Sequence, residues 1–266
     1  MKPDKNEKRK LIMKNYAAVA KNQGANGCCG SSCSCSGTTA DVRDVSKLLG
    51  YTDDDLNEMP DAANMGLGCG NPLAIAALKP GETVLDLGSG GGFDCFLARR
   101  QVGAEGQVIG VDMTPDMLML ARQNAQKAGY ANVSFRLGEI EHLPVADNSV
   151  DVIISNCVIN LALDKEQVFR DAYRVLKPGG RLSISDIVAT AELPEKIKND
   201  LALLAGCISG AEYVENIRTM LQQAGFQEIS LTPKDNSREI LNSWVPDIQA
   251  EYYVASYIIE AIKPLD

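Results

Sequence analysis

Histidine is nearly absent from this chain: His142 is the single one among 266 residues. Catalytic triads that use a histidine base, and metal sites built from several histidines, therefore have too few groups to form. No run of residues approaches the roughly 18 apolar positions that a membrane-spanning helix needs. The amino-terminal segment also lacks the long apolar centre of a secretory signal. We expect a cytoplasmic protein that does not bind membranes.

Basic residues are also relatively few: the chain has 26 of them against 35 acidic residues, which gives a net charge of −9. Binding to a nucleic-acid backbone requires a basic face, so we expect no nucleic-acid partner. The first 21 residues differ, with seven Lys or Arg against two Asp or Glu. We interpret this segment as a solvated, poorly ordered terminus. The length predicts one large domain, or one domain with an appendage.

Cysteine is the informative residue type, with eight in the chain. Cytoplasmic thiols stay reduced, so they bind metals or react more often than they form structural disulfides. Four of them lie in a Gly- and Ser-rich stretch over residues 24–39 that we expect to be a flexible loop: Cys28, Cys29, Cys33 and Cys35. The other four are isolated: Cys69, Cys95, Cys157 and Cys207.

From about residue 73 onwards, short apolar runs alternate with helical periodicity. Strands are expected over residues 83–87, 108–111, 133–137, 150–155, 181–188, 226–231 and 252–262. Helices are expected over residues 11–20, 42–49 and 213–224, after the glycines that follow 83–87, from Pro115 to Gly129, and from a capping box at Asp164 to the turn at 177–180. Such alternation predicts an α/β fold with a mostly parallel sheet that helices cover on both faces. Ligands of these sheets bind at the carboxyl ends of the strands.

The first predicted strand runs into the sequence Asp86-Leu-Gly88-Ser-Gly90-Gly-Gly92. Glycines let the backbone turn tightly and approach a ligand closely. Asp112 ends the second strand, where a carboxylate can accept both hydroxyls of an adenosine ribose. The nicotinamide fingerprint requires a third glycine where this chain has Phe93. The pattern therefore indicates a site for a different adenosine-containing cofactor.

The segments VLDLGSGGGFD, VIGVDMTPDML, GEIEHLPVADNSVDVIISN and RVLKPGGRLSISD resemble the successive signatures of class I S-adenosylmethionine-dependent methyltransferases. The resemblance covers about residues 70–190 and implies a Rossmann-like fold with seven strands, the last antiparallel. It implies cofactor contacts from the methionine end to the adenine edge at Asp86, Gly88, Ser89, Gly90, Gly92, Asp112, Met113, Glu139, Ile140, Glu141 and Asn156. We expect His142 to be a partly exposed loop residue.

Three of the isolated cysteines fall where that fold places the methyl acceptor. Cys157 follows the fourth strand, Cys69 precedes the first core helix, and Cys207 follows the fifth strand. Thiolates that converge on one site bind a soft, thiophilic centre. We expect Cys95, by contrast, to be a small buried apolar residue.

The motifs GCCGSSC, NMGLGCGNP, SNCVINL and AGCISGA are similar to the cysteine-bearing motifs of bacterial arsenite methyltransferases, along nearly the whole chain. The resemblance implies that Cys69, Cys157 and Cys207 bind trivalent arsenic, delivered as arsenite or its thiol conjugates. S-adenosylmethionine is the expected methyl donor, and no metal cofactor is expected. Cys28 or Cys29 is a candidate redox partner, with thioredoxin or glutathione as the reductant. Residues 1–66 are then an extension with the Cys-rich loop. Residues 67–266 are the methyltransferase domain with arsenic-binding cover segments.

Two alternatives stay open. An enzyme of the same fold could methylate a carbon or oxygen of a small metabolite such as a quinone precursor, but that chemistry needs a general base, for which His142 is not placed. Alternatively, a metal-binding protein could hold zinc at the cluster that begins with Cys28 and Cys29. Zinc ligands usually come in C-x₂₋₄-C pairs, which adjacent cysteines fit poorly. The sequence also leaves open the final methylated product and the oligomeric state.

Overall fold

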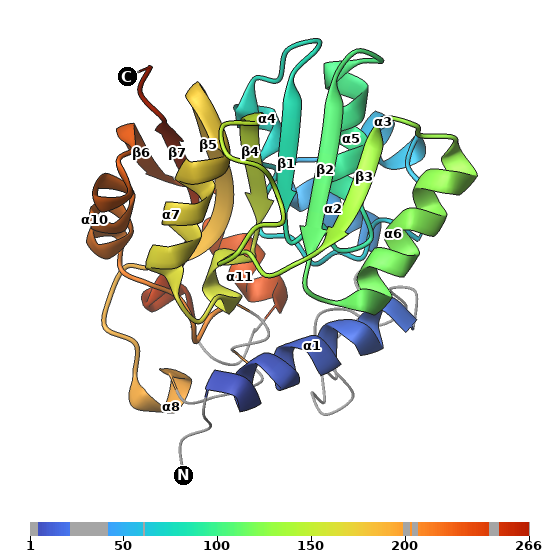
Figure 1. The fold of residues 1–266 in the computed structure, drawn as a ribbon. Coiled ribbons are helices and arrows are strands. Elements are labelled where there is room, and N and C mark those ends of the chain that lie inside the picture. Colours follow the sequence, from blue (N-terminus) through green and yellow to red (C-terminus); the bar gives the residue numbers. More distant parts are fainter. Residues whose placement is uncertain are drawn as a thin grey trace.

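The computed structural model describes residues 5–21, 42–60, 62–198, 203, 207–244 and 250–265. Its strands form one seven-stranded sheet in the order β3-β2-β1-β4-β5-β7-β6 (Figure 1). The strands are β1 (Thr83–Leu87), β2 (Gln107–Asp112), β3 (Val133–Leu137), β4 (Val150–Asn156), β5 (Leu176–Ala189), β6 (Gln227–Pro233) and β7 (Val254–Ile262). Strand β7 is antiparallel to both β5 and β6, while β1 to β5 pair in parallel. The prediction of a mostly parallel seven-stranded sheet with an antiparallel last strand is confirmed.

Helices cover both faces of this sheet. They are α1 (Lys5–Lys21), α2 (Val42–Leu49), α3 (Asp53–Asn57), α4 (Leu73–Ala76), α5 (Phe93–Val102), α6 (Pro115–Ala128), α7 (Lys165–Val175), α8 (Glu195–Lys198), α10 (Val214–Ala224) and α11 (Ser237–Trp244), with short 3₁₀ turns η1 (Ile159–Leu161) and η2 (Ala250–Tyr252). Helices α7 and α10 bury their apolar sides against one face of the sheet. Helices α2, α4, α5, α6 and α11 contribute to the core on the other face. Helices therefore cover both faces of the sheet, and the site described below lies at the carboxyl ends of its parallel strands.

Local chemistry sets most helix ends where the sequence predicts them. Pro115 begins α6, and Gly129 ends it in the left-handed conformation that glycine adopts without strain. Asp164 caps α7 by accepting the backbone N–H of Gln167. The predicted capping box is only half formed, because the Gln167 side chain accepts from Arg170 Nε and not from the backbone N–H of Asp164. Strand β5, however, begins five residues before the predicted 181. The residue before a proline disfavours helical geometry, so the chain turns extended ahead of Pro178.

The amino-terminal helix α1 crosses the carboxyl ends of the parallel strands (Figure 1). Its Ile12 is 1% exposed, which places it in the core. Two of its basic residues pair with carboxylates of the sheet domain, Arg9 with Glu139 at 3.1 Å and Lys21 with Asp116 at 3.6 Å. The interpretation of this segment as solvated and poorly ordered is therefore wrong over Lys5–Lys21. Its positive charge meets a complementary negative surface.

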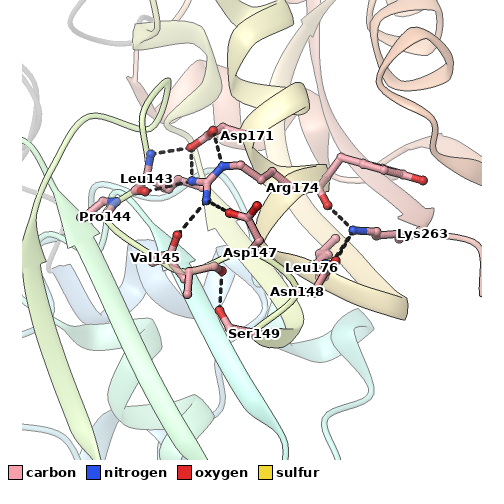
Figure 2. Close-up of polar contacts among 12 residues, drawn as sticks. Leu143, Pro144, Val145, Asp147, Asn148, Ser149, Asp171, Arg174, Leu176 and Lys263 are labelled. Atoms are coloured by element: carbon pink, nitrogen blue, oxygen red, sulfur yellow. Dashed lines mark hydrogen bonds and ion pairs between the residues drawn. The ribbon is translucent and has the colours of Figure 1, made fainter.

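A polar network around Arg174 and Lys263 fastens the loop between β3 and β4 to α7 and to the chain beyond β7 (Figure 2). Arg174 pairs with Asp171 and Asp147 and donates to the carbonyl oxygens of Val145 and Leu143. Nearby, Lys263 is 8% exposed. It donates to Asn148 Oδ1 and to two main-chain carbonyl oxygens. The network holds the loop whose first residues line the pocket described below.

Cys28, Cys29, Cys33 and Cys35 all lie outside the described residues. Within the described part of the chain, no helix has the length and apolarity that crossing a membrane requires.

Candidate active site

A pocket of about 1160 Å³, its open mouth included, lies at the carboxyl ends of β1, β2 and β4. This is the edge where parallel α/β sheets bind ligands. Nine of the eleven predicted cofactor residues line it: Asp86, Gly88, Ser89, Gly90, Asp112, Met113, Ile140, Glu141 and Asn156. Gly92 and Glu139 are not among the lining residues. Glu139 instead pairs with Arg9, which does line the pocket.

The glycine loop after β1 needs its glycines for two different reasons. Gly88 has φ +72°, and a Cβ there would lie 2.2 Å from Val158 Cγ2. Gly92 begins α5 with φ +93°, and a Cβ there would lie 2.7 Å from the ring of Phe96. The absence of a side chain at Gly88 brings backbone close to the pocket wall. At Gly92 it lets α5 pack onto the sheet, which is why Gly92 does not face the pocket.

Asp112 is held rigidly at the end of β2. Its two carboxylate oxygens accept the backbone N–H groups of Gly90 at 3.0 Å and Thr114 at 2.8 Å. Burial raises the pKa of Asp112 above its usual value despite these hydrogen bonds. A carboxylate has about four acceptor sites, so it retains capacity for ligand hydroxyls.

Two observations show that the pocket fits a polar, cationic ligand. Ser89 Oγ is the only buried side-chain N or O atom among the described residues that has no hydrogen-bond partner. Buried polar groups almost always have a partner, so this hydroxyl fits one that a ligand supplies. Four carboxylates, those of Asp86, Asp94, Asp112 and Glu141, also line the pocket, and Arg9 is the one basic residue among the described lining residues. S-adenosylmethionine, with its ammonium and sulfonium groups, matches this set of groups.

Burial controls the charge on these carboxylates. It raises the pKa of Asp94 to about 6, although Tyr51 and Asn156 donate hydrogen bonds to it. The pKa of Asp86 is raised well above its usual value by burial and by the neighbouring charge of Asp94. A cation in the pocket would reverse these shifts, because it stabilises the ionised forms.

Cys95 is fully buried, as predicted, but its environment is not purely apolar. Its Sγ donates a hydrogen bond to Asp86 Oδ2 at 3.2 Å. His142 is exposed, as expected for a loop residue.

The three cysteines predicted to hold the acceptor lie in one apolar cluster but come from separate parts of the chain. Among the described residues, the ligand atoms that lie within 4.8 Å of one another belong to Cys69, Cys157 and Asp186, and Cys207 is outside that group. Cys69, Cys157 and Cys207 are all buried, within an apolar cluster that includes Leu161 and Ile187. Cys69 Sγ donates to the carbonyl oxygen of Ser185 at 3.2 Å, and Cys207 Sγ donates to that of Cys157 at 2.8 Å. Burial, with hydrogen bonds to Cys207 and Cys69, raises the pKa of the Cys157 thiol. Cys157 also lines the cofactor pocket.

Cys157 and Cys207 both have a left-handed backbone, with φ of 58° and 63°. Residues other than glycine rarely adopt this backbone conformation, which costs about 1–3 kcal/mol and is concentrated at functional sites. The N–H of Cys157 donates to the carbonyl oxygen of Ser185 at 2.8 Å and holds the turn in place. The backbone thus directs both thiols inward at the end of the sheet.

The structure adds three polar residues that the sequence did not single out. A carboxylate oxygen of Asp186 lies within 4.8 Å of the Cys69 and Cys157 sulfur atoms. Burial raises the pKa of Asp186 to about 6. Asp94 and Tyr51 join the pocket, and Tyr51 donates to Asp94 Oδ1 at 2.6 Å. Asp94 lies two residues after Gly92 and Asp186 ends the RLSISD segment, so both belong to motifs from which they could have been predicted. Tyr51 belongs to no such motif.

A family model described as a methyltransferase domain matches residues 78–225. Together with the sheet order and the glycine loop, this match makes the chain a class I methyltransferase.

Similarity to particular methyltransferases identifies the family within this class. An arsenite methyltransferase of Halobacterium salinarum is 49% identical over 98% of this chain and 68% of its own length. One from Aquipseudomonas alcaligenes is 42% identical over 78% of this chain and 62% of its own length. The crystal structure of an arsenic(III) S-adenosylmethionine methyltransferase from Chlamydomonas reinhardtii superimposes with a TM-score of 0.59 and 32% identity, over 86% of this chain and 74% of that one. The chain belongs to the arsenite methyltransferase family of S-adenosylmethionine-dependent enzymes.

Proposed function

We propose that this chain transfers the methyl group of S-adenosylmethionine to trivalent arsenic held by the thiolates of Cys69, Cys157 and Cys207. The observation that carries the proposal is the meeting of three buried thiols beside the cofactor pocket, with Cys157 lining it. Three sulfur ligands match the valence and the thiophilic character of trivalent arsenic.

Arsenic binding is an exchange of hydroxide for thiolate. Arsenous acid, As(OH)₃, reacts with three thiols to give As(SR)₃ and three waters, so each thiol proton leaves with a hydroxide. The product is neutral. Neutrality suits this site, because burial raises the pKa of Cys157 and disfavours uncompensated thiolates among apolar side chains.

In the transfer step the protein acts by positioning. When bound, S-adenosylmethionine supplies a methyl group on a positively charged sulfur. The lone pair of arsenic forms the As–C bond while the C–S electron pair returns to sulfur, so no base has to remove a proton. Asp112 and the glycine loop hold the methyl donor, and Cys157, which lines the same pocket, holds arsenic next to it. This chemistry calls on no resident metal.

Methylation oxidises arsenic to the pentavalent state, so further rounds require reduction. Two thiols can return arsenic to the trivalent state by closing a disulfide, which thioredoxin or glutathione then reopens. We assign this step to Cys28 or Cys29 together with the ligand thiols. The division into an extension over residues 1–66 and a domain over 67–266 is part of the same proposal. Tyr51 and Met65 of the extension line the pocket, so the extension also contributes to the site.

Methyl transfer by the purified protein tests the proposal. The protein is incubated with S-adenosylmethionine labelled in its methyl group and a phosphine reductant, with arsenite, without it, or with a phenolic quinone precursor. We expect labelled methylarsenicals only in the arsenite reaction. Label in the quinone precursor and none on arsenic would establish the carbon or oxygen acceptor instead.

A further inference from the structure

The side-chain amide of Asn156 holds the backbone of the segment that carries Cys69. Asn156 Oδ1 accepts the N–H of Cys69 at 2.9 Å, and Asn156 Nδ2 donates to the carbonyl oxygen of Gly70 at 2.8 Å. The approach is close, since a Cβ at Gly68 would lie 2.5 Å from Asn156 Nδ2. One side chain therefore fixes the main chain on both sides of a proposed arsenic ligand.

The same amide also contacts the cofactor pocket. Asn156 lines the pocket, and its Nδ2 donates to Tyr51 Oη at 3.0 Å and Asp94 Oδ2 at 3.2 Å. Tyr51 donates in turn to Asp94 Oδ1 at 2.6 Å. With two hydrogens on Nδ2, one serves Gly70 and the other is shared between Tyr51 and Asp94. The amide is thus a direct hydrogen-bonded link from a pocket carboxylate to the Cys69 segment.

Only an amide can make this set of contacts. The backbone N–H of Cys69 requires an acceptor and the carbonyl of Gly70 requires a donor, which also fixes which way the amide is turned. An aspartate at this position would lose all three donated bonds and would place a second carboxylate beside Asp94. A serine would be too short to bridge the two backbone groups.

We propose that Asn156 is a positioning residue that couples the two substrates: a cationic methyl donor in the pocket tightens arsenic binding by holding Cys69 in its ligating position. The proposal rests on the proposed function. A cation stabilises ionised Asp94, and a hydrogen bond to a charged acceptor is stronger than one to a neutral acceptor. Hydrogen bonds along a chain polarise each other, so the contact of Asn156 with the Cys69–Gly70 backbone strengthens as well.

Arsenite affinity, measured by calorimetry with and without a donor analogue, tests this coupling. The probe is sinefungin, in which a protonated amine replaces the sulfonium, so nothing is transferred. Adenosylhomocysteine, whose sulfur is uncharged, is the second probe. Sinefungin should tighten arsenite binding about fivefold or more, within the usual range of coupling between sites, and adenosylhomocysteine should do less. By reciprocity, arsenite should tighten sinefungin binding by the same factor.

In Asn156→Ala the coupling factor should fall close to one. The matched control is Asn132→Ala, which removes an amide that bridges the carbonyl oxygens of Gly103 and Gly106 and accepts from Arg99, outside the pocket. This control should keep the native factor, although it loses comparable hydrogen bonds. Tyr51→Phe, which leaves the Asn156 amide in place, should give a factor below the native one.

The outcomes separate the inference from the function. The coupling is overturned if the native protein has a coupling factor of one, or if Asn156→Ala has the same coupling factor as the native protein. If Asn156→Ala does not fold, an unchanged factor in Tyr51→Phe overturns it. Failure of the native protein to bind arsenite at all overturns the proposed function instead.

Discussion

Cys207 donates its thiol hydrogen to the main-chain oxygen of Cys157, 2.8 Å away. This bond ties the segment after β5 to the residue that directly follows β4. In the complex that we propose, arsenic replaces the thiol hydrogen, so this bond is lost and arsenic itself joins the two segments. Asn160 still holds the Cys207 segment, because its Nδ2 donates to the Cys207 carbonyl oxygen at 3.1 Å. Two hydrogen bonds therefore connect Cys207 to the residues that follow β4.

Valence separates the roles of the three cysteines. Arsenite takes three thiolates, whereas methylarsenite takes two, so one cysteine is dispensable for the second methylation. Cys157 and Cys207 already contact each other, so we expect them to be the retained pair. Cys157→Ser and Cys207→Ser should abolish methylation of both substrates. Cys69→Ser should lose arsenite methylation and keep part of its activity on methylarsenite, measured with labelled donor. Full arsenite activity in Cys157→Ser would contradict the three-thiol site.

The carboxylate of Asp112 is expected to bind the ribose of the donor. Asp112→Ala leaves two hydroxyls without a charged acceptor, and such hydrogen bonds contribute about 1.5–3 kcal/mol each, so donor affinity should fall at least about tenfold. Calorimetry with S-adenosylmethionine measures the change. Asp54→Ala, which removes an exposed carboxylate on α3, is the control and should bind normally. Equal affinities in the two variants would refute the assignment.

The pKa of Asp94, raised to about 6 by burial, makes donor binding depend on pH. Without a ligand, folding favours the protonated form of Asp94, because its pKa is higher in the folded than in the unfolded chain. The contribution of Asp94 to stability is therefore present below the unfolded pKa near 3.8 and is lost as the pH rises through about 6. A cationic donor needs the ionised form. The rise in melting temperature caused by S-adenosylmethionine should therefore grow between pH 5 and pH 7.5. Asp94→Asn should flatten this profile, and a rise that shrinks with pH in the native protein would contradict the account.

Lys263 contributes to stability rather than to chemistry. Its Nζ donates to Asn148 Oδ1 and to the carbonyl oxygens of Tyr173 and Leu176, all within 2.8 Å (Figure 2). Lys263→Met leaves these acceptors without a donor, and the Leu176 carbonyl oxygen among them is buried, so the free energy of unfolding should fall by about 1–3 kcal/mol in urea titration. Lys177→Met is the matched control, because the half-exposed pair of Lys177 with Asp151 contributes at most about 1 kcal/mol. Equal losses in both variants would show that the network is not a stabilising feature.

The sequence predicted the sheet well because its strands are short, buried and bounded by turn residues. The bounds of β1 and β3 match the prediction to the residue. A helix over residues 11–20 was predicted, but the packing of α1 against the sheet domain was not, because its many lysines suggest a solvated segment. Pairs such as Arg9 with Glu139 join residues far apart in the chain, and no local pattern reveals them. Helix α11 was not predicted either, since its one described fully buried pair, Ile240 and Leu241, gives no repeating apolar pattern.

In the candidate site, too, residues within one motif could be predicted, whereas contacts between distant parts of the chain could not. Residues within one motif, such as Asp86 and Ser89, were placed at the pocket because a strand and its following loop fix their position locally. The bond between Asn156 and Cys69 joins residues 87 positions apart and depends on how the Cys69 segment folds back over β4. Tyr51 donates to Asp94, which lies 43 positions further along the chain. Spacing in the sequence carries no information on such contacts.

X-ray absorption at the arsenic edge, on the reduced protein loaded with one equivalent of arsenite, tests the central claim most directly. The native protein should show three sulfur neighbours around trivalent arsenic and no oxygen. Cys157→Ser should show two sulfur neighbours and one oxygen. An oxygen-only shell in the native protein, or three sulfur neighbours retained in Cys157→Ser, would contradict the account.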